Sequence, residues 1–249
     1  MEYIFPVAEM ENYIFGFLDP FVDFKKLFLV NKYYHGVIIN TNIYIELKNF
    51  RLNKPKITFS IDNLKKEEIL FILACQNNYL LVAKYLLHEY TTINIHAENE
   101  YAFRLVCAEG HLKVAMWLYD MAIGLNSPIN IHEYNDCAFM WACSNGHLEI
   151  AMWLYNLDLK MNSSIDIHAN NELAFGWACS KNHLQVAKWL YDLGKENNSL
   201  VNTNIDNDYA FKWSCIYGHL EVAEWLCTLC DKYQIDINPI TKKIKYSIN

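Results

Sequence analysis

An eighteen-residue segment of this chain occurs twice in nearly the same form. Residues 138–155 read AFMWACSNGHLEIAMWLY, and residues 174–191, which begin 36 positions later, read AFGWACSKNHLQVAKWLY. Gly-His-Leu begins at Gly110, Gly146 and Gly218, Asn182-His183-Leu184 fills the remaining slot, and a degenerate copy begins at Asn78. Self-similarity at a fixed period of this size is typical of stacked supersecondary units. The repeat therefore favours duplicated architecture over duplicated chemistry.

Each unit carries two helical patterns separated by a tight turn. In one unit the first pattern places apolar residues at i, i+1, i+4 and i+5, namely Ala102, Phe103, Val106 and Cys107. After Glu109-Gly110 helical spacing resumes with Leu112, Ala115, Trp117 and Leu118. Two antiparallel helices this short cannot cover their own apolar faces, so each pair must stack on the next. The prediction is an all-α solenoid of helix-turn-helix repeats.

The seven tryptophans follow the same period in two series. One series is Trp141, Trp177 and Trp213, and the other is Trp117, Trp153, Trp189 and Trp225. They lie on apolar faces beside alanine and leucine, so we expect enlarged core residues and no ligand-stacking role.

Short polar linkers separate the units. Each holds an asparagine followed by an acid at the same phase, in the pairs Asn99-Glu100, Asn135-Asp136, Asn171-Glu172 and Asn207-Asp208. Asparagine tolerates positive φ, and an acid in a first helical turn complements the helix dipole. We therefore expect turns in the linkers, with no strands.

These motifs resemble the ankyrin repeat, in which a hairpin precedes two helices. Asn135 stands where the family's hairpin glycine is found, Phe139 where its core leucine is found, and Gly146-His147 match its Gly-His turn. The family's Thr-Pro is replaced by Cys137-Ala138. The resemblance covers residues 64–238, about five repeats, followed by a C-terminal tail at 239–249. The variant pattern of the repeats is most similar to ankyrin proteins of giant DNA viruses.

The N-terminal segment has a second resemblance. Residues 1–42 resemble an F-box, a helical module that docks an adaptor protein of ubiquitin ligases. The resemblance implies that the adaptor contacts are Pro6, Ile14, Leu18, Leu27 and Val30. The alternative is a helical cap that only shields the first repeat. Residues 43–63 carry charge and a proline and are predicted to be a connector.

Composition excludes several classes of partner. The net charge is −7 and the chain has two arginines, so it lacks the basic surface that nucleic-acid binding requires. No apolar run is long enough to span a membrane, and the first residues lack the positive region of a signal peptide. We expect an intracellular protein in the cytoplasm, which would be the host cytoplasm if the chain is viral.

The cysteines and histidines are also phased, which argues against special chemistry. Stacked helices lie about 8–10 Å apart, too far for cysteines at one repeat phase to form disulfides. Equivalent histidines of neighbouring repeats are likewise too far apart to share a metal ion, so structural hydrogen bonds are expected. We also found no motif for phosphate binding or nucleophilic catalysis. No enzyme activity, metal or other cofactor is predicted.

A few positions change type between repeats while their neighbours stay fixed. In proteins that this chain resembles, hairpin tips and the first-helix face line a groove that binds a protein partner. The residues predicted to contact a protein target are Glu98, Arg104, Glu109, Tyr134, Met140, Asn145, Asn170, Lys181, Asp206, Lys212 and Tyr217. The function predicted is a non-enzymatic adaptor that links a target to ubiquitin-ligase machinery; a plain scaffold or competitive inhibitor is the alternative.

The last helix pair is followed by QIDINPI, which resembles the start of another linker, and by no polar closing repeat. Terminal repeats of a solenoid need a polar outer face for solubility. We therefore expect a partly exposed apolar flank on the last pair.

Overall fold

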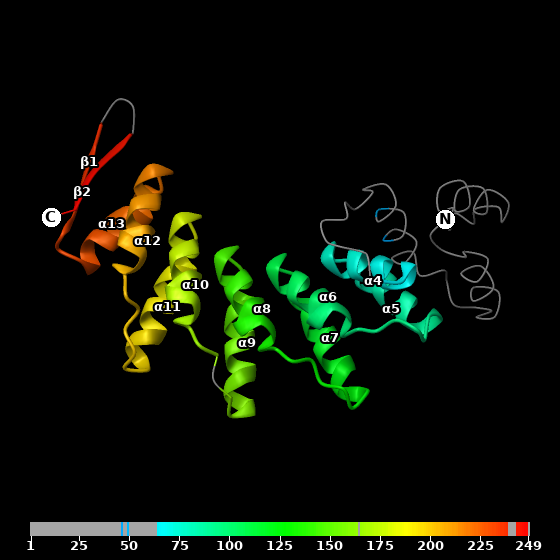
Figure 1. The fold of residues 1–249 in the computed structure, drawn as a ribbon. Helices are drawn as coiled ribbons and strands as arrows, with labels where there is room; N and C mark the ends of the chain where they lie inside the picture. Colours follow the sequence, from blue (N-terminus) through cyan, green and yellow to red (C-terminus); the bar gives the residue numbers. More distant parts are fainter. Residues whose placement is uncertain (1–45, 47–48, 50–63, 164, 239–242, 249) are drawn as a thin grey trace, which may run out of the picture. The chain divides into compact units, whose positions relative to one another are not determined.

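The structure is a computed structural model that describes residues 46, 49, 64–163, 165–238 and 243–248 (Figure 1). The chain divides into two compact units, Met1–Ala102 and Phe103–Asn249, with the boundary inside one helix. The described residues form ten helices, α4 to α13, and two strands.

The described part of the first unit contains α4 (Lys66–Gln76), α5 (Leu80–Glu89) and the start of α6 (Ala97–Ala108). Residues 69–75 of α4 are all apolar and all buried, so this helix lies within the core of the unit. Glu68 closes its first turn by accepting the Lys65 N–H at 2.9 Å. The carboxylate of Glu46 accepts the Leu81 N–H at 2.9 Å and so caps the start of α5.

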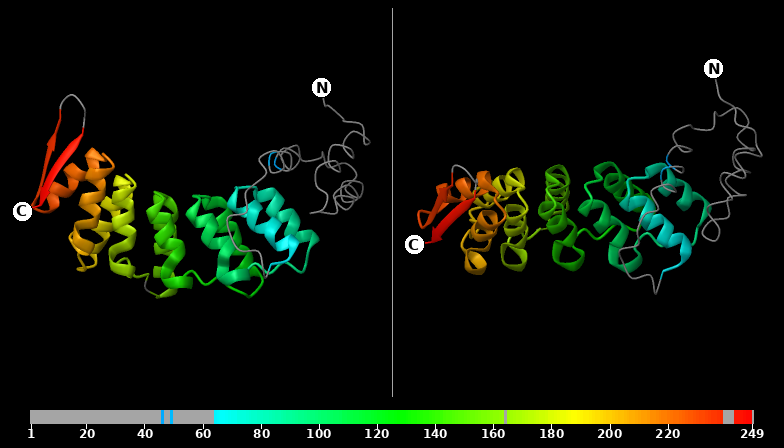
Figure 2. Two further views of the ribbon diagram at one scale, coloured as in Figure 1. Left: turned by 45° about the horizontal axis from the view of Figure 1, so that its top comes forward. Right: turned by 90° about the horizontal axis from the view of Figure 1, so that it is seen from above.

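The second unit continues α6 and repeats the same helix pair. Its helices are α7 (Leu112–Gly124), α8 (Glu133–Ser144), α9 (Leu148–Met161), α10 (Ala169–Ser180), α11 (Leu184–Glu196), α12 (Ile205–Ile216) and α13 (Leu220–Leu229). The first helices α8, α10 and α12 pack in a row, because α10 contacts both α8 and α12, and each of the three also packs on the second helix of its own pair (Figures 1 and 2). The predicted stack of helix pairs is confirmed for this unit.

Aromatic side chains join successive pairs of the second unit. Phe103, Phe139, Phe175 and Phe211 are almost completely buried. The Trp153 ring lies 6.1 Å from that of Phe103 and edge-on to that of Tyr119, so a tryptophan of one pair fits between two rings of the pair before. Trp189 and Trp225 repeat the arrangement. Trp153, Trp189 and Trp225 are therefore packing residues as predicted, although all seven tryptophans are only half-buried.

Glycine stands in three of the turns between paired helices, and Asn182 takes the same place between α10 and α11 at φ +66°. Gly146 has φ +84°, a conformation that other residues adopt at a cost. The ring of His183, from the next pair, also occupies the space that a Cβ at this glycine would need. His147 lies in the same way against Gly110, whereas nothing lies within 4 Å of the Cβ position at Gly218.

The linkers contain a left-handed turn of three consecutive residues. Tyr134, Asn135 and Asp136 all have φ between +53° and +59°. The same conformation recurs at 98–100, 170–172 and 206–208. A left-handed residue with a side chain costs roughly 1–2 kcal/mol and asparagine or aspartate tolerates it best, so neighbouring contacts must hold each turn in place. The described linker residues include no strand, so the predicted turns are confirmed.

A β-hairpin follows α13. Strand β1 (Tyr233–Ile237) pairs antiparallel with β2 (Ile244–Ile248). The Tyr233 ring stacks on that of Phe211 at 4.1 Å and 4°. The all-α prediction is therefore incomplete, because β2 lies in the segment expected to be a tail. The expected apolar flank is only partly present, since Tyr233 covers Phe211 while Ile216 and Tyr217 of the last pair remain exposed.

Candidate functional site

The histidines and acids of the linkers form pairs in which the carboxylate is buried and the histidine is partly exposed. His132 Nδ1 lies 2.6 Å from Asp136 Oδ1, and His168 Nδ1 lies 2.8 Å from Glu172 Oε1. In the first unit His96 Nδ1 lies 2.8 Å from Glu100 Oε1. The three carboxylates are 5–6% exposed, so they begin the helix as expected but are also part of the core. The predicted structural hydrogen bonding of these histidines is confirmed.

The same carboxylates also hold the following linker. Asp136 Oδ2 accepts the Asp166 N–H at 3.1 Å, and Glu172 Oε1 accepts the Asn202 N–H at 3.0 Å. A buried carboxylate that accepts hydrogen bonds from both sides offsets the cost of the left-handed turn that carries it. The paired acids therefore link each repeat of the second unit to the next.

In the last linker, different groups bind the carboxylate at the start of the helix. Asn204 stands at the phase of the histidines, and Asp208 instead contacts Lys232 Nζ at 2.6 Å and accepts the Tyr233 hydroxyl at 2.8 Å. Burial raises the pKa of the Tyr233 phenol and the contact with Asp208 adds to this rise. The hydroxyl therefore stays protonated and remains a hydrogen-bond donor. Burial opposes ionisation of Asp208, but the contacts with Lys232 and Tyr233 outweigh it and lower the pKa of that carboxyl.

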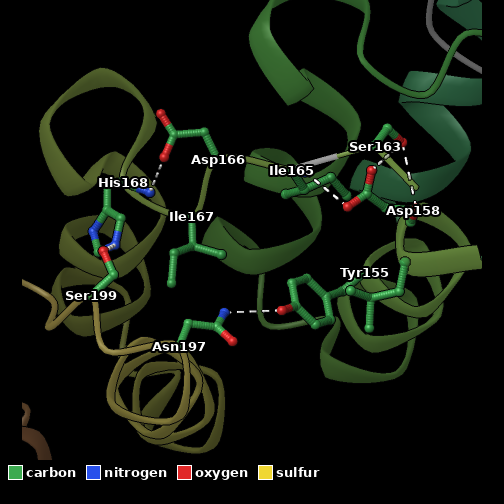
Figure 3. Close-up of a pocket in the computed structure, with 10 residues that line it drawn as sticks. Tyr155, Asp158, Ser163, Ile165, Asp166, Ile167, His168, Asn197 and Ser199 are labelled. Atoms are coloured by element: carbon green, nitrogen blue, oxygen red, sulfur yellow. Dashed lines mark hydrogen bonds between the residues drawn. The ribbon is translucent and has the colours of Figure 1, made fainter. Parts of the chain in front are cut away.

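A cavity of about 400 Å³ opens beside the linker that precedes α10 (Figure 3). The ends of α9 and α11 and the linker between α9 and α10 form its walls. Its lining residues are Tyr155, Asp158, Leu159, Ser163, Ile165, Asp166, Ile167, His168, Asn197 and Ser199. Asn197 Nδ2 donates to the Tyr155 hydroxyl at 3.0 Å, and Asp158 Oδ2 accepts the Ile165 N–H at 2.9 Å. The cavity therefore has an ordered polar wall together with apolar side chains.

The residues predicted to contact a partner differ in exposure. Those that are exposed are Glu98, Glu109, Tyr134, Asn170, Lys181, Asp206 and Tyr217. Asn145 and Lys212 are half-buried, whereas Arg104 and Met140 are only 7% and 6% exposed. The two buried residues have little side-chain surface to offer a partner.

Within the second unit several of these residues contact one another across successive repeats. The Arg104 guanidinium lies over the Tyr134 ring at 4.6 Å from its centroid. Asn170 Nδ2 donates to Met140 Sδ at 3.3 Å. Each contact joins a residue of one first helix to a residue of the next linker. Arg104 and Met140 thus support the exposed side chains at the linker turns.

A second series of contacts runs along the turns between paired helices. Lys181 Nζ donates to Asn145 Oδ1 at 2.9 Å and lies over the Trp177 ring. Asn145 Nδ2 in turn donates to the Ala108 carbonyl at 2.8 Å. At the end of the series Tyr217, which is 59% exposed, lies against Trp213 with the ring centroids 5.2 Å apart. The turn side of the first helices therefore combines aromatic rings with a positive charge.

The cysteines are free thiols. Burial raises the pKa of the Cys75, Cys143 and Cys179 thiols well above the usual range, so they remain protonated and behave as small apolar side chains. Among the residues that the structure describes, no group of three or more potential ligands is arranged to hold a metal ion.

The F-box-like segment at 1–42, with Pro6, Ile14, Leu18, Leu27 and Val30, lies outside the described residues, as does nearly all of the connector. None of the helices in the described ranges is both long and apolar enough to cross a membrane.

Sequence reasoning missed contacts that join residues about 30 positions apart. His132 Nε2 lies 3.1 Å from Ser163 Oγ, and His168 Nε2 lies 2.7 Å from Ser199 Oγ. Ser163 and Ser199 are themselves 36 positions apart, which is a signal that the repeat analysis could have used. Tyr233 was also missed, because it belongs to no repeat phase.

Comparison with known families supports the repeat assignment. A family model described as ankyrin repeats (3 copies) matches residues 70–165. A second, described as ankyrin repeats (many copies), matches residues 175–226. Together the two matches cover more than half of the chain. No curated protein matches it.

Proposed function

The chain belongs to the ankyrin-repeat family, whose repeats are protein–protein interaction modules, and we propose that its second unit binds a protein target through exposed side chains at the linker turns and at the turns between paired helices. The observation that carries this proposal is the exposed aromatic and positively charged surface around Tyr134, Lys181 and Tyr217. Exposed aromatic side chains are enriched at binding hot spots, and packing of the stack does not require their outer surface.

The neighbouring contacts favour recognition by a preordered surface. Arg104 supports Tyr134 from beneath, Trp177 lies under Lys181, and Trp213 lies beside Tyr217. Side chains that are already ordered lose less conformational entropy when a partner binds. Tyr134 and Tyr217 are therefore the best candidates for anchors.

The test is capture of partners from cell extract by the full chain and by variants. Tyr217→Ala and Lys181→Glu should each lower recovery of a specific partner by at least about tenfold, the size expected for a hot-spot residue. Lys195→Ala and Glu224→Ala, at exposed positions on second helices, serve as matched controls. Equal recovery by all four variants would reject this surface.

We further propose that residues 1–42 recruit ubiquitin-ligase machinery, so that the chain acts as a substrate-recruiting adaptor in the cytoplasm. The support is the F-box resemblance of that segment, and eight free cysteines are consistent with a reducing compartment. The variant Leu18→Asp should abolish co-purification of a ligase adaptor and leave target binding intact. Failure of the unaltered full chain to recover a ligase adaptor would contradict the proposal.

The second candidate is a plain scaffold or competitive inhibitor in which residues 1–42 only cover the first repeat. The two proposals predict opposite results for deletion of that segment. Under the scaffold view the first unit loses stability. Under the adaptor view the repeats keep their thermal midpoint and only recruitment is lost.

A further inference from the structure

At two places in the second unit, a serine of one linker is joined by hydrogen bonds to a histidine and a carboxylate of the linker before it. In the first, His132 lies between Ser163 and Asp136. In the second, Ser199 Oγ lies 2.7 Å from His168 Nε2 (Figure 3), and His168 Nδ1 lies 2.8 Å from Glu172 Oε1. This order of groups is the one that activates a serine hydroxyl as a nucleophile, because the carboxylate orients the imidazole and the imidazole accepts the hydroxyl proton.

The two chains of contacts differ at one residue. The Ser163 hydroxyl lies 2.5 Å from Asp158 Oδ1, and this carboxylate is also 3.3 Å from His132 Nε2. The Ser163 hydroxyl therefore donates its proton to a carboxylate, and His132 Nε2 lies beside the same carboxylate oxygen. A hydroxyl has one proton to donate, so the Ser163 proton is not directed at His132 and the contacts of Ser163 are structural.

At the second place Gly194 of α11 stands 36 positions after Asp158, so no carboxylate at this position competes with the histidine for the serine proton. A Cβ at Gly194 would lie 2.6 Å from the Ser199 carbonyl oxygen, which shows how closely the two backbones approach. Within the described part of the chain His168 is the hydrogen-bond partner of the Ser199 hydroxyl. With the Nδ1 proton donated to Glu172, the Nε2 lone pair of His168 faces this hydroxyl.

The cavity supplies room for a substrate beside Ser199. Ile165 and Ile167 give it an apolar wall, and Tyr155 and Asn197 supply hydrogen-bond donors. The Tyr155 hydroxyl accepts a hydrogen bond from Asn197, so its own proton remains to be donated. The exposed Asp166 adds negative charge at the opening and disfavours anionic ligands.

We propose that Ser199 is an activated nucleophile that accepts an acyl group from a small neutral or cationic ester, with His168 as the general base and Glu172 as the residue that positions it. As the Ser199 Oγ bonds to the ester carbonyl carbon, its proton moves to His168 Nε2. The bond from that carbon to the leaving oxygen then breaks, and His168 returns the proton to the leaving alcohol. Water hydrolyses the acylated serine by the same proton path, releasing the acid. The net reaction converts an ester and water into an acid and an alcohol.

The experiment treats the full chain with a fluorophosphonate probe and locates the adduct by peptide mass spectrometry. Adduct is expected on Ser199 and not on Ser163, which is a matched control in the same molecule with the same histidine contact. Equal modification of both serines, or no adduct on Ser199, would overturn the proposal.

Variants distinguish general-base catalysis by His168 from reactivity that reflects only the exposure of Ser199. His168→Gln should slow both adduct formation and release of p-nitrophenol from p-nitrophenyl acetate by at least about 100-fold, and Ser199→Ala should abolish both. Circular dichroism checks that each variant is folded. If His168→Gln does not fold, the comparison of Ser199→Ala with Ser163→Ala decides, because only the first should lose p-nitrophenol release. An unchanged rate in Ser199→Ala would also reject the assignment.

Discussion

Phe175 and Phe211 hold the same position in successive repeats but are covered by different parts of the chain. The ring of Phe175 is met at a tilt by Trp225, which belongs to the following helix pair, whereas that of Phe211 is stacked flat by Tyr233 of the hairpin. The hydroxyl of Tyr233 also binds Asp208, whose counterpart Glu172 is bound by a histidine. One residue outside the repeat pattern thus replaces both an aromatic ring and a polar partner at the end of the stack.

Removal of the Tyr233 ring, which covers Phe211, should have the largest effect on stability. Tyr233→Ala should lower the free energy of unfolding by about 3–5 kcal/mol, because it exposes Phe211 and leaves Asp208 without a buried hydrogen bond. Tyr233→Phe keeps the stacking and should cost about 1–3 kcal/mol. Urea denaturation of the two variants measures the difference. Equal losses would mean that the stacking contributes nothing beyond the hydroxyl.

Substitution of a turn glycine should destabilise an internal repeat more than the last repeat. Gly218→Ala should cost about 1–2 kcal/mol, because alanine is strained at this positive φ. Gly146→Ala carries the same strain and also clashes with the His183 ring, which should add about 1–3 kcal/mol. Thermal and urea unfolding of both variants provide the measurement. If the two losses are equal, the histidine ring does not pack on the glycine as described.

Acid should weaken the last repeat through Asp208. The pKa of this carboxyl is lower in the folded chain than its ordinary value of 3.8, so its contribution is complete above that value and is lost as the pH falls through the folded pKa. Hydrogen exchange of the hairpin amides between pH 5 and pH 2 follows this loss, apart from the intrinsic pH dependence of exchange. Lys232→Met should reduce the pH dependence. An unchanged profile would show that Lys232 does not stabilise the carboxylate.

Exposed residues of both regions should matter least for stability. Lys181→Met removes a surface hydrogen bond and a cation–π contact and should change the free energy of unfolding by less than about 1 kcal/mol. Tyr217→Ala in the last repeat should have an effect of similar size. Denaturant midpoints test both variants. A loss above about 2 kcal/mol would identify either residue as part of the core instead of the binding surface.

Most of the repeat could be predicted because its signals are local. The apolar spacing around Phe139 predicts a helix whatever surrounds it, and an asparagine such as Asn135 favours a left-handed turn by its own chemistry. The period then places each unit beside the next. In the candidate interaction surface Tyr134 and Tyr217 are exposed, as contact with a partner would require, whereas burial of Arg104 and Met140 could not be read from variation between repeats.

The sequence by itself determined the period, the helix pairs and the buried ladder of aromatic and cysteine side chains. These follow from the apolar spacing within one repeat and from the match between repeats. Only the tertiary structure decided which histidine meets which serine, and that Tyr233 covers Phe211. Those contacts join residues 22 to 31 positions apart, and their geometry depends on how one repeat is placed against the next. A hydrogen bond tolerates a variation of only a few tenths of an ångström in its donor–acceptor distance, so a pattern that fixes the order of the repeats still leaves such pairs undecided.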